Sequence, residues 1–240
     1  MEKEVLIEKK KGKGRPFIIL LPEGKYEDGA EVLYDSLPDS HNVVLIKIQE
    51  VQVNTWLHSV QRLQELIELE GLRHFHFLAF GEASIFPEWY YLLNPKMFRN
   101  IIFVDPVSRL YPNKNGFSDY LEFSWENLVD VIEKHLPLGL PLRGGSGHFD
   151  SNAYLHRIRC PVLIVSSPEA SQGQREEASA MAIKLPTAWH KEISIQDGIK
   201  ALPLLVQDFL EVPARCSQKS NSSSASKSIP VDNPSKLKAP

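Results

Sequence analysis

Short, uninterrupted apolar runs recur along this chain, and segments with a helical hydrophobic pattern separate most of them. A continuous apolar run of about four to eight residues is typical of a strand buried on both faces, as in a parallel sheet. Strands that alternate with helices form right-handed crossovers that cover both faces of the sheet. The pattern therefore predicts an α/β domain with a mostly parallel central sheet and helices on both faces.

The individual elements follow from the same pattern. The expected strands lie at 5–7, 17–21, 43–48, 75–80, 101–104, 161–165 and 188–195. The expected helices lie at 29–37, 55–70, 86–93, 125–136, 174–185 and 199–211. The clearest helix is 55–70, because Trp56, Val60, Leu63 and Ile67 fall on one face of a 3.6-residue period. We expect this face to be buried.

The composition changes at Pro213. The remaining residues, 213–240, hold eight serines, four prolines and few apolar side chains, which predicts a disordered tail. The tail carries a net charge of +4 and the whole chain −3, so residues 1–212 carry −7. We therefore expect one folded domain over 1–212, a usual size for a single domain.

Charge and cysteine content narrow the class of protein. A net charge of −3 gives no reason to expect nucleic acid as a partner. The first residues have no apolar signal-peptide core, and no run approaches the ~18 apolar residues of a membrane span. The two cysteines, Cys160 and Cys216, are expected to be free thiols. These features predict a cytoplasmic protein without a transmembrane segment.

Other motifs favour ordinary structural roles. The Lys/Gly run from Lys9 to Arg15 is expected to be a solvated turn. His74 and His76 alternate around a phenylalanine, and no third ligand accompanies them, so solvent-facing strand residues are expected rather than a metal site. The glycine loop 144–148 lacks the Lys-Ser/Thr of a phosphate-binding P-loop and is expected to be a lid or mobile loop. No cofactor is predicted.

Four stretches carry a family resemblance. They are a strand with a glycine turn at 17–24, a strand entering a tight turn at 77–84, a strand closed by Asp-Pro at 100–106, and a strand that begins with Arg-Cys-Pro at 159–166. Their order and spacing resemble the α/β-hydrolase superfamily over roughly residues 16–212. The resemblance implies an α/β-hydrolase-like sheet with a reduced cap, and an oxyanion-type turn at Pro22, Glu23 and Gly24.

The resemblance also implies a nucleophile on a sharp strand-to-helix turn of the form G-x-S-x-G. The matching residues are Gly81, Glu82, Ala83, Ser84 and Ile85, so the nucleophile position is Ala83, which has no attacking atom. Ser84 is one residue further on, where a helix-cap or first-turn role is expected.

The other two members of a catalytic triad are also missing from their expected places. The position of the acid corresponds to Ala170, beside Glu169, and 194–200, where the base should lie, contains no histidine. His190 lies within the preceding strand. A hydroxyl becomes nucleophilic only when a positioned base takes its proton. The sequence thus argues against ordinary serine hydrolase chemistry.

Two main functions follow as expectations, and a scaffold whose basic tail docks on an acidic protein or membrane surface is a third. The first is a non-catalytic homologue that binds a small apolar or acyl-bearing ligand, or a protein partner. The alternative is a serine esterase or thioesterase with an atypical constellation, formed by Ser84 or Ser146 with His148 and Glu169. A serine oxygen within hydrogen-bond reach of a histidine at the carboxyl edge of the sheet would favour the enzyme.

Overall fold

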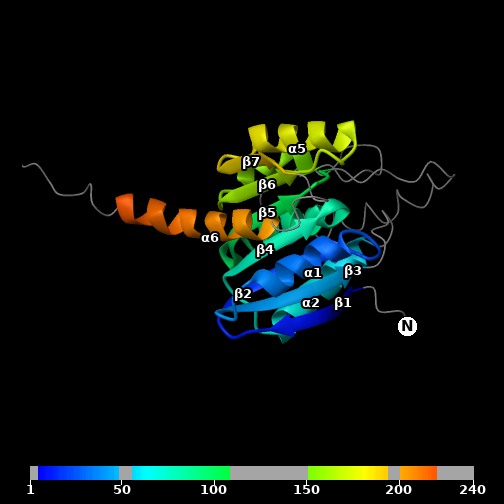
Figure 1. Cartoon of the computed structure of the whole chain (residues 1–240), viewed down its shortest axis with the longest axis vertical. Helices are drawn as coiled ribbons and strands as arrows, with labels where there is room; N and C mark the ends of the chain where they lie inside the picture. Colours follow the sequence, from blue (N-terminus) through cyan, green and yellow to red (C-terminus); the bar gives the residue numbers. More distant parts are fainter. Residues whose placement is uncertain (1–4, 49–55, 109–150, 194–200, 221–240) are drawn as a thin grey trace, which may run out of the picture.

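A seven-stranded sheet forms the centre of the computed structural model, which describes residues 5–48, 56–108, 151–193 and 201–220 (Figure 1). The strand order is β1-β3-β2-β4-β5-β6-β7. β1 pairs antiparallel with β3, and all other neighbours are parallel. The strands are β1 (Val5–Lys11), β2 (Arg15–Pro22), β3 (His41–Ile48), β4 (Phe75–Phe80), β5 (Phe98–Val104), β6 (Val162–Ser166) and β7 (Ala188–Glu192). The predicted mostly parallel sheet is confirmed.

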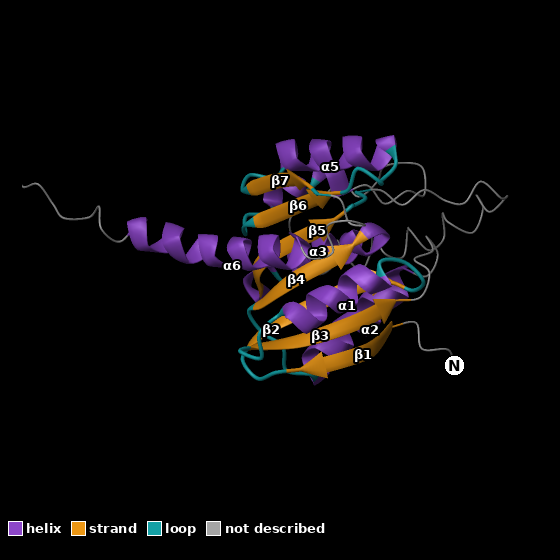
Figure 2. Cartoon of the chain, in the orientation of Figure 1, coloured by secondary structure: helices purple, strands orange, loops and turns teal. Residues whose placement is uncertain are grey.

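Helices cover both faces of the sheet, as predicted (Figure 2). One face packs against α1 (Glu27–Ser36) and α6 (Ala201–Ser220). The other packs against α2 (Trp56–Leu69), α3 (Ile85–Leu93) and α5 (Gln172–Lys184). The expected helix at 125–136 lies outside the described residues. The central strands β2 and β4 bury residues on both faces, which explains their continuous apolar sequences.

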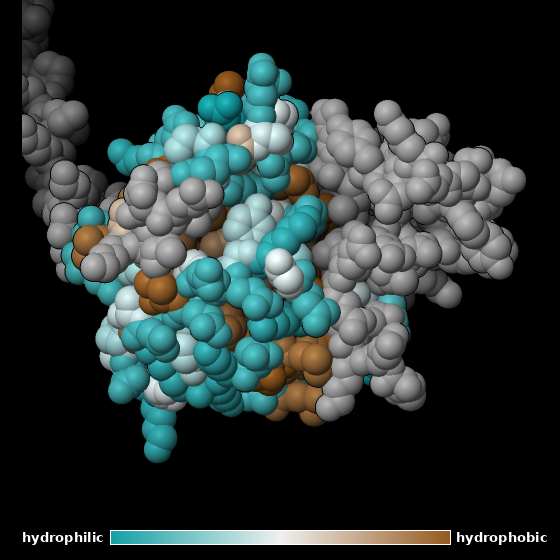
Figure 3. Space-filling view, turned by 45° about the vertical axis from the view of Figure 1, so that its right-hand side comes forward, coloured by the Kyte–Doolittle hydropathy of each residue, from teal (hydrophilic) through white to brown (hydrophobic). Residues whose placement is uncertain are grey.

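The predicted apolar face of α2 is buried. Val60, Leu63 and Ile67 are 4%, 2% and 0% exposed and belong to one core cluster. The side chain of Trp56 lies outside the described residues. Large apolar side chains that remain exposed are dispersed over several elements, and the face drawn in Figure 3 is mainly hydrophilic with small, separate apolar areas. The two core clusters therefore account for most of the apolar sequence.

The turn expected from Lys9 to Arg15 is shorter than predicted, because Lys9, Lys10 and Lys11 continue the edge strand β1. Each lysine has a partner on a helix. Lys9 pairs with Glu31 of α1, Lys10 pairs with Glu70 after α2, and Lys11 donates to two backbone carbonyls at the end of α1. Lysines are common on edge strands, where they oppose pairing with another sheet.

The prediction that His76 faces solvent was wrong, because His76 is only 5% exposed. It lies on the central strand β4, where its register partners are Phe17 of β2 and Asn100 of β5. A central strand covered by helices on both faces has no solvent side, so alternation in its sequence does not indicate exposure. His74 precedes β4, has a left-handed backbone (φ 53°) and is exposed.

The last helix is longer than expected. α6 begins at Ala201 and continues past Glu211 to Ser220, so the first residues of the expected tail are helical. Pro213 lies within this helix, although proline disfavours helix interiors. Residues with good helix propensity follow it, including Ala214, Arg215, Gln218 and Lys219. The domain boundary at 212 stays a prediction, and residues 221–240 lie outside the described part of the chain.

Candidate functional site

The carboxyl ends of β2, β4, β5 and β6 meet at one edge of the sheet, which is where open α/β sheets bind ligands. Tyr26 follows β2, Gly81 follows β4, Asp105 follows β5 and Ser167 follows β6. Tyr26, Gly81 and Asp105 have left-handed backbones, and Ser167 is a buried polar residue. The edge is therefore the candidate functional site.

The sharp turn between β4 and α3 is made at Gly81. This residue follows the last strand residue directly and has a left-handed φ of 51°. Glycine reaches this conformation without steric cost, whereas other residues do so rarely. Ala83, the position expected for the nucleophile, lies two residues later in the 3₁₀ turn Gly81–Ser84 and is fully buried. The strained corner and the expected nucleophile position thus do not coincide.

The Tyr26 ring fills the space beside Gly81. A Cβ atom built on Gly81 would lie 2.8 Å from Tyr26 Cε2 and 3.2 Å from its hydroxyl oxygen. The ring also stacks on Phe80, with ring centroids 5.4 Å apart. Tyr26 itself has a left-handed φ of 62° at the start of α1. Tertiary contacts therefore hold this tyrosine across the corner at Gly81.

The Tyr26 hydroxyl stays protonated at neutral pH. Burial raises its pKa, and the nearby carboxylates of Asp105 and Glu82 raise it further, while a hydrogen bond with the Gln174 side chain lowers it. A neutral phenol can donate or accept a hydrogen bond but is a poor nucleophile. The geometry thus gives Tyr26 a space-filling and polar-contact role.

Ser84 is fully buried, and its hydroxyl has two backbone partners. Its Oγ donates to the carbonyl oxygen of Val107 at 2.7 Å and accepts from the Val107 amide at 3.0 Å. These bonds tie the turn after β4 to the segment that follows β5. The hydroxyl already uses its proton in this clamp, as expected of a structural serine.

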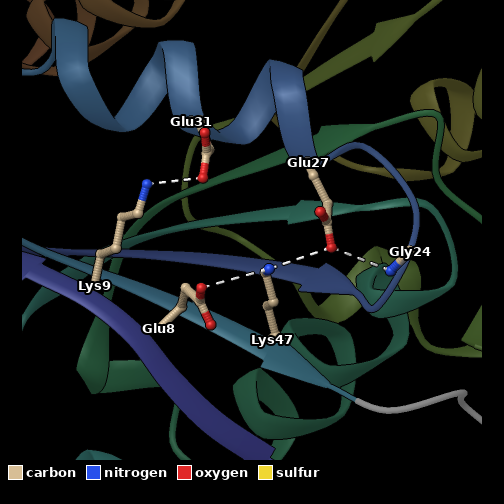
Figure 4. Close-up of polar contacts among 6 residues, drawn as sticks. All are labelled: Glu8, Lys9, Gly24, Glu27, Glu31 and Lys47. Atoms are coloured by element: carbon tan, nitrogen blue, oxygen red, sulfur yellow. Dashed lines mark hydrogen bonds and ion pairs between the residues drawn. The ribbon is translucent and has the colours of Figure 1, made fainter.

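The backbone amides of the expected oxyanion-type turn are occupied within the turn and its neighbours. Glu23 N donates to Ile48 O at 2.7 Å, and Lys25 N donates to Pro22 O at 3.4 Å. Gly24 N donates to the carboxylate of Glu27 at 3.4 Å (Figure 4). None of these three donors is left free for an oxyanion.

Three lysine–glutamate contacts lie near the same turn, and one of them, Lys47–Glu27, involves the glutamate that binds Gly24. In Figure 4, Lys47 of β3 reaches Glu27 of α1 at 3.2 Å and Glu8 of β1 at 3.6 Å. Lys9 binds Glu31 one helical turn further along α1. Since Glu27 also accepts from Gly24, the strands and the start of α1 form one connected polar set.

Asp105 is a buried carboxylate that the sequence did not single out as a site residue. It is 3% exposed, has a left-handed φ of 48°, and accepts from Ser167 N at 2.6 Å and Ser167 Oγ at 2.7 Å. Burial raises its pKa, and the two hydrogen bonds from Ser167 oppose this shift. The sequence signal was the Asp-Pro pair that closes β5.

The residues expected at the acid position lie close to Asp105 but differ from it in environment. Glu169 is exposed and Ala170 is partly exposed, in the turn before α5. The charge of Glu169 contributes to the raised pKa of Asp105. The buried carboxylate at this edge is therefore Asp105, one strand away from the expected place.

One serine and one histidine lie within hydrogen-bond distance of each other, although the sequence did not predict this pair. Ser166, the last residue of β6, places its Oγ 2.8 Å from Nε2 of His190 on β7. Ser166 is 2% exposed, whereas His190 is exposed. Both belong to regular strands, and the register pairs His190 with Ile164. Contact between neighbouring parallel strands of this kind cannot be read from sequence spacing alone.

The segment 109–150 enters and leaves the domain at one place. Ser151 N and Oγ donate to Ser108 O at 2.9 Å and 3.1 Å, so the two ends of the segment are joined. Ser108 also donates to Glu177 of α5 from its amide and hydroxyl, at 2.7 Å and 2.6 Å. The expected site residues Ser146 and His148 belong to this segment and lie outside the described residues. The segment lies between β5 and β6 in the chain.

The described residues contain no group of three or more His, Cys, Asp or Glu side chains placed to hold a metal ion. In the same part of the chain, no helix combines the length and hydropathy needed to cross a membrane.

Comparisons with known proteins find similarity in structure alone. No protein-family model and no curated protein sequence matches the chain. An α/β-hydrolase enzyme from a sediment metagenome of the Mar Chica lagoon, Morocco, has a TM-score of 0.63 at 13% identity, covering 89% of this chain and 98% of that one. A thermophilic esterase from Thermogutta terrifontis scores 0.62 at 15% identity, covering 86% and 93%. The N-acyl homoserine lactone degrading enzyme Est816 scores 0.57 at 12% identity, covering 85% and 96%.

Proposed function

Since the chain has the α/β-hydrolase fold, we propose that it is a non-catalytic protein of this fold that binds a small apolar or acyl-bearing ligand, or a protein partner. The observation that carries the proposal is the contact between Tyr26 and Gly81. In this fold the nucleophile sits on the strained strand-to-helix corner. Here the left-handed corner residue is Gly81, so we place the nucleophile position there instead of at Ala83.

Gly81 has no side chain, and the space for one is occupied. A serine at this corner would need its Cβ 2.8 Å from a ring carbon of Tyr26, closer than Cβ contacts are found. The surrounding small residues, Ala79 and Ala83, are compatible with the tight backbone approach that the corner requires. The turn at Gly81 thus has the backbone conformation expected for a nucleophile elbow, but the Tyr26 ring occupies the space that the nucleophilic side chain would need.

The neighbouring groups support the same conclusion. The hydroxyl of Ser84 is bound at both its donor and acceptor functions by Val107. The amides of Glu23, Gly24 and Lys25 have partners within the protein. Stabilisation of a developing oxyanion requires donors aimed at empty space where the charge will appear. Among the described residues of the predicted site, the hydroxyl of Ser84 and the amides of the turn after β2 are thus already engaged within the protein.

Ester-type ligands are the class we favour for the small-molecule half of the proposal. Two of the similar structures are described as an esterase and an N-acyl lactone degrading enzyme. A domain that keeps the α/β-hydrolase fold but lacks the catalytic residues can still bind such compounds. Thermal shift assays with methyl octanoate, a simple ester, and with an N-acyl homoserine lactone test this. A rise in Tm with either compound supports this ligand class. If neither compound changes Tm, the small-molecule half of the proposal fails and the protein partner remains.

Labelling with a reactive fluorophosphonate tests the absence of catalysis, because the probe modifies activated serines whatever the substrate. We expect no labelling of the full chain and no turnover of p-nitrophenyl esters above the buffer rate. Labelling that Ser84→Ala abolishes would overturn the proposal and restore the predicted alternative enzyme. A parallel reaction with an active serine esterase shows that the probe is competent.

A second candidate function is an esterase or thioesterase that uses Ser166 and His190. Their 2.8 Å contact has the distance of a nucleophile and its base. Ser166 is 2% exposed and belongs to a regular strand instead of a sharp turn, which disfavours attack on a substrate. Fluorophosphonate labelling lost in Ser166→Ala and retained in Ser84→Ala would identify this pair as the reactive centre.

A further inference from the structure

Two buried polar side chains lie side by side far from the carboxyl edge, near the amino ends of β4 and β5. His76 is 5% exposed and Asn100 is 2% exposed, and they are register partners. Their sequence neighbours Phe75, Phe77 and Ile101 belong to the core beneath α2, α3 and α5, so His76 and Asn100 point to the opposite face, which α1 and α6 cover. They are thus enclosed between the sheet and this helical layer.

Both side chains present atoms without a hydrogen-bond partner among the described residues. These atoms are Nδ1 of His76 and Nδ2 of Asn100. Nδ1 of His41, whose ring centroid lies 6.2 Å from that of His76, is also unpaired within the described part of the chain. Buried polar groups nearly always have a protein, water or ligand partner. Nδ1 of His76 and Nδ2 of Asn100, on neighbouring strands and on the same face of the sheet, therefore indicate a bound species.

The charges around this cluster are all positive. The electrostatic interactions that act on His76 come from His41, Arg99 and Arg15, with no carboxylate among them. Together with burial, they lower the pKa of His76 to about 4. The amide nitrogen of Asn100 can only donate, and a protonated imidazole donates from both nitrogens. The surroundings therefore favour a negatively charged hydrogen-bond acceptor and disfavour a cation.

We propose that His76 and Asn100 bind a small monovalent anion, of the size of chloride or formate, between the sheet and α1. The ligand must be small because the Phe17 ring, 5.9 Å from the His76 ring, and the His41 ring, 6.2 Å from it, crowd the side towards β2 and β3. The Asn100 amide donates to the anion, and His76 donates a second hydrogen bond from its protonated ring. Binding therefore takes up a proton on His76 at mildly acidic pH.

Thermal unfolding of the full chain at pH 5.5 tests the proposal, with sodium chloride or formate compared with sodium gluconate at equal ionic strength. Gluconate is a much larger anion than chloride or formate and serves as the non-binding reference. We expect a saturating rise in Tm with the small anions, of about 3–6 °C at ten times the dissociation constant. Asn100→Leu should abolish the difference between chloride and gluconate, whereas Arg62→Gln, which removes a cation on the distant helix α2, should retain it.

A titration of the His76 imidazole by NMR in the wild-type chain provides a second measurement that does not depend on the folding of a variant. Chloride should move the pKa of His76 upward relative to gluconate. Identical Tm and identical titration in both salts would mean that water alone occupies the cluster and would overturn the proposal. An equal chloride effect in wild type and Asn100→Leu would overturn it too, since the anion would then bind elsewhere.

Discussion

The Tyr26 ring lies where a side chain on Gly81 would project, with Cε2 only 2.8 Å from the position of the missing Cβ. Tyr26 comes from the turn after β2 and Gly81 from the corner after β4, and both have left-handed backbones. The two residues are therefore mutually dependent: the ring needs a glycine, and the glycine leaves a space that the ring fills.

Gly81→Ser should destabilise the protein by more than about 2 kcal/mol, because it adds left-handed strain of about 1–2 kcal/mol to the clash with Tyr26. Urea denaturation measures the change. In a Tyr26→Ala background the same substitution should cost less, with a coupling of about 0.5–3 kcal/mol. Equal costs in the two backgrounds would show that the ring does not oppose a side chain at position 81.

Ala83→Ser should not create an efficient hydrolase. Ala83 is fully buried within the 3₁₀ turn, and 194–200 contains no histidine to act as base. Turnover of a p-nitrophenyl ester should stay far below the usual enzyme range of about 1–10³ s⁻¹. Rates in that range would reveal an acid and a base that lie elsewhere in the chain.

Leu63→Ala should lower the free energy of unfolding by about 2–5 kcal/mol, because Leu63 is 2% exposed in the core beneath α2. Leu69 on the same helix is 88% exposed and provides a matched control. Leu69→Ala should change stability by less than about 0.5 kcal/mol. Similar losses for both variants would contradict the assigned orientation of α2.

Ser84→Ala should destabilise the protein by about 1–3 kcal/mol, since it removes a fully buried hydroxyl and leaves the amide and carbonyl of Val107 without their partner. Ser179→Ala is the control, because Ser179 is exposed and bonds only within its own helix. The comparison is made by urea denaturation at neutral pH. A loss no greater than that of the control would argue against the clamp.

His76 should make the protein less stable as pH falls from about 6.5 to about 4 in a buffer of large anions. Its pKa is lowered to about 4 by burial and neighbouring cations, so in this window the unfolded state binds more protons than the folded state. The full effect is about 3 kcal/mol by the usual conversion of 1.36 kcal/mol per pKa unit. The free energy of unfolding therefore rises with pH from about 4 to about 6.5, and the contribution of His76 is fully present above this window.

His76→Phe removes the titrating group while keeping a similar volume, so its pH dependence over this window should be shallower than that of wild type. The raised pKa of Asp105 acts in the opposite direction, but it is present in both proteins and cancels in the comparison. Urea denaturation at pH 4.5, 5.5 and 7 measures the difference. Parallel curves for the two proteins would assign the acid sensitivity to other groups.

Local pattern determined most of the fold. Continuous apolar runs located the five inner strands to within a few residues, because a strand buried on both faces cannot contain many polar side chains. A short apolar start and an alternating pattern located the exposed edge strands β1 and β7. The 3.6-residue period of α2 correctly identified Val60, Leu63 and Ile67 as its buried face. The resemblance over four short stretches indicated the α/β-hydrolase fold, and similarity to solved structures bears this out.

Sequence alone did not determine which side chains meet at the edge of the sheet. Asp105 and Ser167 are joined across 62 positions, and Ser166 and His190 across 24. His76 is buried although its alternating neighbours suggested exposure. Such contacts depend on strand order, register and the helices that cover each face, and none of these is encoded within one short segment.

The corner after β4 separates most clearly what the sequence determined from what only the tertiary structure determined. A glycine followed by three small or polar residues at the end of a strand indicated the elbow, but the sequence motif placed the nucleophile at Ala83. Only the folded backbone identified Gly81 as the left-handed corner, and only tertiary packing placed Tyr26 beside it. A short segment determines the propensity to turn, whereas the side chain that fills the resulting space comes from a turn far away in the sequence and is selected by packing.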